Sequence, residues 1–156
     1  LYDPSQQIVR LTGDELRTGI EGGLALFVND YEFGLVQKMT GLSPEDMLKY
    51  LQFTVVTCGR HGSTVYSRDK EYHIPVVQPE NIADPTGVGD AYRGGFLTGY
   101  SHNLDLETCA QMGALAATYC LEQEGTQGHA YTLDEFIKRF RQHFDDREQL
   151  DKLHLK

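Results

Sequence analysis

Two glycines and an acid lie close together in the segment 84–96, which reads DPTGVGDAYRGGF. Gly87 and Gly89 permit backbone conformations, and a close approach by a ligand, that a side chain would forbid. The apolar residues that follow have helical spacing, so the turn should lie at a helix N-terminus, where free N–H groups and the helix dipole attract an anion. Asp90 would repel that anion but could take a proton from an attacking hydroxyl. The segment therefore suggests an anion site with its own base; the common structural alternative is a glycine turn with an acid that complements the helix dipole.

The overall composition is typical of one soluble globular domain, with 156 residues, 40% hydrophobic and 24% charged. A net charge of −9 argues against nucleic acid or an anionic membrane as the main partner. No membrane-spanning run or signal peptide is evident. The odd number of cysteines fits unpaired thiols in a reducing cytosol, so a cytoplasmic location is expected. The three cysteines lack metal-ligand spacing and are expected to be small buried residues: Cys58, Cys109 and Cys120.

Apolar runs and turn signals alternate along the chain. Strands are expected at 24–28, 53–57, 63–67 and 71–77, the last two as a hairpin. Capping signals and helical spacing predict helices at 12–20, 29–39, 43–51, 88–100, 106–124 and 132–144, followed by a frayed, charged end. This alternation indicates an α/β layered fold with a mostly parallel sheet.

Polar residues follow each of the two buried strands. Asn29 and Glu32 come after the first strand, and Thr57 and Gly59 come after the second. Ligands in parallel α/β sheets bind beyond the carboxyl ends of the strands. The turn at 87–90 is expected at the same edge, so three individually weak signals agree on one ligand site.

Together these motifs resemble the PfkB, or ribokinase-like, family of sugar and nucleoside kinases. Segment 84–96 is similar to the family's second signature, D-T-x-G-A-G-D-x-F-x-G-G-F, segment 29–32 to its N-x-x-E motif, and segment 57–62 to its nucleotide-loop motif. Three positions depart from the usual signature without removing a needed group: Pro85, Val88 and Tyr92.

The resemblance covers nearly the whole chain but only the C-terminal half of a family member. It implies a three-layer sandwich with a mostly parallel sheet flanked by helices. Residues 1–156 would form the C-terminal, nucleotide-binding part of a single kinase domain, without the N-terminal substrate and lid part. Because that missing part binds most of the acceptor, the chain alone is expected to be inactive.

The implied activity is transfer of the γ-phosphate of ATP to a primary hydroxyl of a sugar or nucleoside. Asp90 would be the general base, and an anion hole would be formed by the backbone N–H groups of Gly87, Val88, Gly89 and Asp90. The expected partner is thus a small molecule, with no nucleic acid or membrane partner; a homodimer is a further expectation.

The resemblance also implies cofactor contacts. Asn29 and Glu32 would help to hold Mg²⁺ and phosphate, Glu32 through water. The ATP phosphates would be contacted by Thr57, Gly59 and Gly62. Asp84 and Thr86 match positions that contribute to a monovalent-cation site, for K⁺, in some members.

Some assignments stay open. The segment 124–129 leans toward adenosine-kinase-like members, so adenosine kinase specifically is one alternative. A non-catalytic nucleotide-binding relative is the other, although the intact Asp90 argues against it. Arg60, His61 and Arg93 are interpreted as solvated turn or helix residues.

Overall fold

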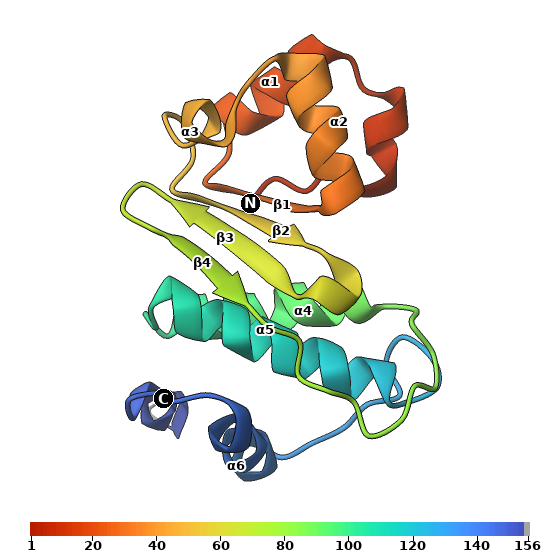
Figure 1. The fold of residues 1–156 in the computed structure, drawn as a ribbon, viewed down its shortest axis with the longest axis vertical. Coiled ribbons are helices and arrows are strands. Elements are labelled where there is room, and N and C mark those ends of the chain that lie inside the picture. The colour runs from red at the N-terminus through yellow and green to blue at the C-terminus, as the bar shows by residue number, and fades with distance from the viewer. Residues whose placement is uncertain (155–156) are drawn as a thin grey trace. The chain divides into compact units, whose positions relative to one another are not determined.

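Short apolar runs form a four-stranded sheet in the order β1-β2-β3-β4. The strands are β1 (Ala25–Asn29), β2 (Phe53–Thr57), β3 (Ser63–Ser67) and β4 (Glu71–Ile74). β1 and β2 are parallel and in register from Ala25 opposite Phe53 to Asn29 opposite Thr57. β3 pairs antiparallel with β2, and β4 runs back beside β3 (Figure 1). Tyr2 adds a parallel bridge to Leu26.

The computed structural model describes residues 1–154, and the chain divides into two units, Leu1–His73 and the residues from Ile74 onward. The first unit also contains the helices η1 (Ser5–Arg10), α1 (Gly13–Glu21), α2 (Asp30–Thr40), α3 (Pro44–Met47) and η2 (Gly59–His61). The second contains α4 (Val88–Ser101), α5 (Leu106–Leu121), α6 (Leu133–His143) and η3 (Gln149–His154).

The α/β class is confirmed, and the parallel part of the sheet is confined to β1, β2 and the Tyr2 bridge. β3 and β4 form the expected hairpin, whose connection is too short for the crossover that a parallel pair needs. β4 ends at Ile74 rather than at residue 77, because Pro75 has no N–H group to continue a ladder.

Reciprocal capping boxes begin the three α-helices of the first unit, α1, α2 and α3, at positions where the sequence predicts helix starts. Thr12, Asn29 and Ser43 each accept a hydrogen bond from the third helical N–H group, and the acid at that position bonds back to the cap. The third helix is shorter than expected. It ends at Met47, after which the chain tightens into i→i+3 turns as far as Tyr50.

The core of the first unit lies between these helices and one face of β1 and β2. Leu26, Val28 and Val56 share that face because alternate residues of a strand point the same way. They pack with residues from the helices and connecting segments, Ile8, Leu16, Ile20, Phe33, Val36, Leu42, Met47 and Leu51.

In the second unit α4 and α5 pack closely because glycines face the partner helix. A Cβ at Gly95 would lie 2.7 Å from the Met112 carbonyl oxygen, and one at Gly113 would lie 2.9 Å from that of Tyr92. Buried Cys109 and Cys120 belong to α5, and burial raises the pKa of Cys109 to about 12. Two of the three cysteines are therefore buried as expected, whereas Cys58 is half-buried.

The expectation of a frayed C-terminal end is wrong for the described residues. Leu150 of η3 is fully buried, and the buried Asp146 accepts hydrogen bonds from Arg141 and from the Leu150 N–H group. The Asp146 carboxylate explains why this segment is ordered, because it is hydrogen-bonded both to the Arg141 guanidinium and to the start of η3.

Glu122, directly after α5, connects three segments of the second unit. Its two carboxylate oxygens accept hydrogen bonds from Arg139 of α6 at 2.6 and 2.7 Å, and one of them also accepts the Glu80 N–H group at 2.8 Å. The Arg139 guanidinium lies 4.6 Å from the centre of the Tyr119 ring. Both charged side chains are largely buried, 9% exposed for Glu122 and 15% for Arg139. Glu122 thereby fixes the start of the loop that leads to Asp84.

Glu122→Gln should lower the free energy of unfolding by about 1.5–3 kcal/mol at neutral pH, the range for hydrogen bonds to charged groups, because the largely buried Arg139 guanidinium loses its counter-charge. The Arg139 hydrogen bonds lower the pKa of Glu122. Its ionised form therefore stabilises the fold above the unfolded-state pKa of about 4.3, and this contribution is lost as the pH falls through the lower folded-state value. Denaturant unfolding between neutral and acid pH should show the difference between wild type and variant narrowing on acidification. A constant difference would contradict this account.

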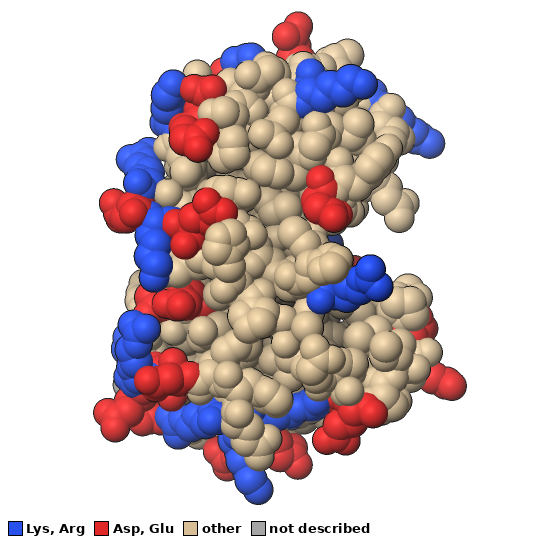
Figure 2. All heavy atoms as spheres, in the orientation of Figure 1, with Lys and Arg blue, Asp and Glu red and all other residues tan. Residues whose placement is uncertain are grey.

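Charges of both signs are interspersed among the described side chains on the face in Figure 2, without an extended basic patch. Within residues 1–154, no helix has the length and apolar character needed to cross a bilayer.

Candidate functional site

The N-terminus of α4 is built on Gly87. This residue has φ +84° in the left-handed region, and a Cβ there would lie 3.0 Å from the Cα of Thr126. No side chain caps the helix, and the Ala91 N–H group bonds to the Gly87 carbonyl oxygen at 2.9 Å. The N–H groups of Val88, Gly89 and Asp90 thus precede the helical hydrogen-bond ladder. The structure places the four predicted anion-hole residues in one turn at a positive helix end, as an anion site requires.

Asp90 lies in this first turn with its side chain 77% exposed, so a ligand can reach it. Its Oδ1 forms an ion pair with the guanidinium of Arg93, one helical turn further on. The Arg93 side chain is only 27% exposed, and burial lowers its pKa. The interpretation of Arg93 as a solvated residue is therefore wrong. The i,i+3 spacing from Asp90 was the signal for this pair in the sequence.

Asp84 ties the turn before α4 to the loop after α5. One carboxylate oxygen accepts the Thr86 N–H group at 2.8 Å, and the other accepts the Gly125 N–H group at 3.1 Å. Hydrogen bonds from Thr86, followed by that from Gly125, lower the pKa of Asp84. The Cys120 thiol donates to the Thr86 carbonyl oxygen at 3.5 Å. Asp84 and Thr86 thus hold the loop that carries Gly87.

In the first unit, Asn29 and Glu32 form the capping box of α2. The Asn29 Oδ1 accepts the Glu32 N–H group, and the Glu32 Oε2 accepts the Asn29 N–H group, both at 2.8 Å. Both residues therefore serve as a helix cap. This cap leaves the second Glu32 oxygen and the Asn29 amide NH₂ without a hydrogen bond among the described residues. Capping and ligand binding are compatible, because each uses different atoms.

Thr57 lies opposite Asn29 in the parallel register, so the structure brings these two predicted residues to one edge of the sheet. A tight turn follows, in which the Cys58 N–H group bonds to the Gly62 carbonyl oxygen at 2.8 Å. Both glycines are needed by the backbone, with φ +53° at Gly59 and +88° at Gly62.

Arg60 and His61, between these glycines, are exposed as expected. The Arg60 Nε lies 3.4 Å from the His61 Nε2.

A hollow beside Glu32 was not foreseen from the sequence. It has a volume of about 540 Å³ and lies between η1 and the start of α2, lined by Gln6, Gln7, Ile8, Val9, Arg10, Tyr31 and Glu32. The turn into η1 begins with an Asp3 carboxylate that accepts the Ser5 N–H group at 2.9 Å, and Ser5 has φ +45°. The sequence Asp-Pro-Ser at residues 3–5 is typical of a turn, and it was the one feature of the sequence that indicated how the chain enters η1 beside this hollow.

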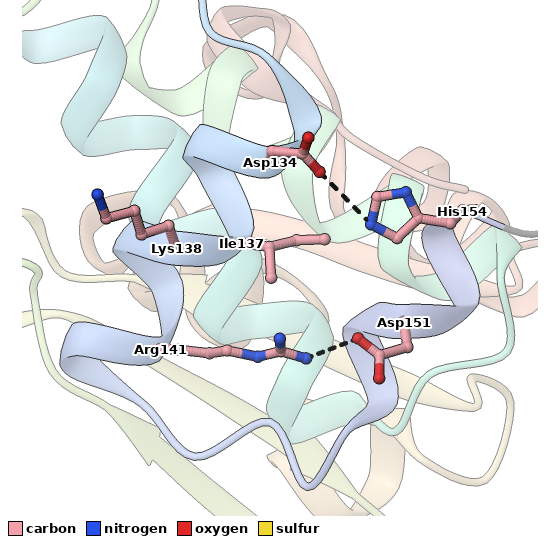
Figure 3. Close-up of a pocket in the computed structure, with 6 residues that line it drawn as sticks. All are labelled: Asp134, Ile137, Lys138, Arg141, Asp151 and His154. Carbon is pink, nitrogen blue, oxygen red and sulfur yellow. Dashed lines mark hydrogen bonds and ion pairs between the residues drawn. The ribbon is translucent and has the colours of Figure 1, made fainter.

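A second hollow, of about 400 Å³, lies between α6 and η3 and contains none of the predicted site residues (Figure 3). Its charged groups largely satisfy one another: Arg141 bonds to Asp151 at 2.8 Å, and the His154 ring lies 3.7 Å from Asp134.

The donor groups fit a magnesium ion that arrives with a nucleotide. Within residues 1–154 no cluster of three or more histidine, cysteine or acidic side chains could hold a metal by itself. Magnesium bound with phosphates needs only one or two protein carboxylates, because it keeps several waters. The spare Glu32 oxygen meets that requirement.

Comparison with known proteins identifies the family. The pfkB family of carbohydrate kinases matches residues 1–132, and the chain therefore belongs to this family. It is 34% identical over 142 residues to a nucleoside kinase of Methanocaldococcus jannaschii, covering 91% of this chain and 47% of that protein. The chain thus spans about half the length of the curated relatives it matches.

Solved structures agree in fold. The M. jannaschii nucleoside kinase, described as an archaeal member of the ribokinase family, superimposes with a TM-score of 0.88 at 35% identity, over 90% of this chain and 47% of that one. A Burkholderia thailandensis nucleoside kinase in complex with inosine gives 0.87 at 38% identity, with the same coverage. The same kinase in complex with ADP-inosine gives a TM-score of 0.87, over 90% of this chain and 44% of that one. The ribokinase-like fold is confirmed.

Proposed function

We propose that the full-length protein carrying this chain is an ATP-dependent kinase that phosphorylates a primary hydroxyl of a nucleoside. One observation carries the proposal: the uncapped N-terminus of α4 combines free N–H groups with an exposed carboxylate in the same turn. A nucleoside is favoured over a simple sugar because the similar relatives are nucleoside kinases and one solved relative contains inosine.

In the proposed reaction Asp90 accepts the proton of the acceptor hydroxyl. The acceptor oxygen then forms a bond to the γ-phosphorus of ATP, the bond from that phosphorus to the β,γ-bridging oxygen breaks, and ADP leaves. The N–H groups of Gly87, Val88, Gly89 and Asp90 would stabilise the charge on the phosphoryl oxygens during the transfer. The hydrogen bonds from the Thr86 and Gly125 N–H groups to Asp84 would hold this turn in place during the transfer.

The first unit would contribute the nucleotide contacts. We assign Thr57, Gly59 and Gly62 to the ATP phosphates, and Asn29 and Glu32 to phosphate and Mg²⁺. When bound, Mg²⁺ would neutralise phosphate charge. Support comes from the parallel register that aligns Asn29 with Thr57 and from the turn that the two glycines shape.

A monovalent cation, K⁺, is proposed at Asp84 and Thr86. Both Asp84 oxygens already accept backbone N–H groups, so the carboxylate is held in place without the ion. An ion there would reinforce the same loop through the lone pairs that remain on these oxygens.

We also propose that the chain is the nucleotide-binding, C-terminal part of one kinase domain and is inactive alone. The relatives are about twice as long as the segment that matches, which supports a need for further residues to form the acceptor site.

The test is transfer of labelled γ-phosphate from ATP by the full-length protein to inosine, adenosine, cytidine, ribose and fructose. We expect the nucleosides to be phosphorylated with a higher kcat/KM than the sugars. Activity on adenosine alone would support the adenosine-kinase alternative. ATP binding without transfer to any acceptor would contradict the kinase proposal and favour a non-catalytic relative.

A further inference from the structure

The Asp90–Arg93 pair of α4 is not explained by stability. Asp90 is mostly exposed and Arg93 mostly buried, and ion pairs with an exposed partner add little to folding stability. Long side chains on a helix lean toward its N-terminus, which brings the guanidinium toward the positive end of the helix dipole, where a cation is unfavourable. The lowered pKa of Arg93 reflects the same burial cost. The pair thus places a largely buried cation against the exposed acid of the proposed site.

The contact is confined to one oxygen of the carboxylate. Arg93 donates a hydrogen bond to Asp90 Oδ1, whereas Oδ2 forms no hydrogen bond among residues 1–154. Because the arginine is the more buried partner, it is the fixed side of the pair, and the exposed carboxylate is oriented by it. The carboxylate would otherwise rotate freely in solvent.

We propose that Arg93 is a positioning residue for Asp90. Its guanidinium binds Oδ1 and thereby presents Oδ2 to the acceptor hydroxyl, whose proton Oδ2 accepts. The inference rests on the proposed role of Asp90 as the base. Arg93 exchanges no proton and forms no bond to phosphorus.

The test compares Arg93→Gln, Arg93→Lys and Arg93→Met in the full-length protein. Arg93→Gln and Arg93→Met should lower kcat by about 10- to 100-fold, the effect expected when a reacting group is misplaced, with both KM values within about twofold of wild type. Arg93→Lys keeps the positive charge beside Asp90, so its kcat should stay within about threefold of wild type because the base remains in place. Arg141→Gln is the matched control: it removes another Arg–Asp interaction of the second unit, away from α4, and should leave kcat unchanged.

A double-mutant cycle separates positioning from other roles. In an Asp90→Asn background, single-turnover phosphate transfer should be no slower when Arg93→Gln is added, because the base that Arg93 orients has already gone. An equal loss in both backgrounds would overturn the proposal, as would a raised KM for ATP with unchanged kcat, which would indicate a phosphate contact.

Near-normal turnover of Arg93→Gln with an inactive Asp90→Asn would reject only this inference. Near-normal turnover of Asp90→Asn would reject the proposed base itself. The melting temperature of each variant shows whether a loss of activity is due to unfolding. Arg93→Lys is the variant expected to stay folded and is the reference for this comparison.

Discussion

Asp90→Asn should lower the turnover number of the full-length kinase by about 10³-fold while ATP still binds, since a general base contributes about 10²- to 10⁴-fold. The amide preserves the size of the side chain and can still accept a hydrogen bond from Arg93, but it cannot take a proton at neutral pH. Steady-state kinetics and calorimetric titration with an ATP analogue measure the two effects separately.

Asp134→Asn is the control for this substitution. Asp134 is also an exposed acid in the first turn of a helix of the second unit, but it belongs to α6. Asp134→Asn should change neither the turnover number nor the binding of the ATP analogue. If Asp90→Asn were as active as Asp134→Asn, the acid of α4 would only complement the helix dipole.

The two glycines of the anion turn should respond oppositely in stability. Gly87→Ala should lower the free energy of unfolding by about 1–3 kcal/mol, because an alanine is strained at a positive φ and its methyl group would press on Thr126. Gly89→Ala should raise it by about 0.5–1 kcal/mol, the usual preference for alanine over glycine within a helix. The Cβ at Gly89 meets no atom within 4 Å.

Activity should nevertheless fall in both variants. The methyl group at position 89 would stand beside the N–H groups proposed to contact the phosphoryl oxygens, and losing one such donor costs about 10²- to 10³-fold in kcat. Gly94→Ala is the matched control, since it lies in the same helix and is equally unobstructed. It should gain the same stability and keep full activity. Full activity of Gly89→Ala would mean that no ligand approaches this backbone.

Much of this structure could be predicted from local patterns. The capping boxes at Thr12, Asn29 and Ser43 use side chains three residues apart, so the sequence determines them almost alone. The turn at Gly87 was predictable for the same reason, because few residues other than glycine adopt its left-handed conformation. The resemblance to the family motifs then assigned these local features to one expected phosphate-transfer site.

Contacts between distant residues could not be predicted in this way. The hydrogen bond from Gly125 to Asp84 and the contact between Gly87 and Thr126 join residues about forty positions apart, and no spacing rule indicates them. The buried Leu150 in a charged tail was missed for another reason: the Asp146 carboxylate, bonded to Arg141 and to the Leu150 N–H group, lies outside any regular helix spacing rule. These contacts rigidify the loops on which the proposed chemistry depends.

The most direct test of the central claim is a structure of the full-length protein with ADP, Mg²⁺, aluminium fluoride and inosine. The fluoride group stands in for the transferring phosphoryl group. It should lie about 2.7–3.1 Å from the N–H groups at the start of α4, the range expected for an anion hole, with the inosine primary hydroxyl at hydrogen-bond distance from Asp90. A fluoride group bound elsewhere, with Asp90 out of reach of the hydroxyl, would contradict the account.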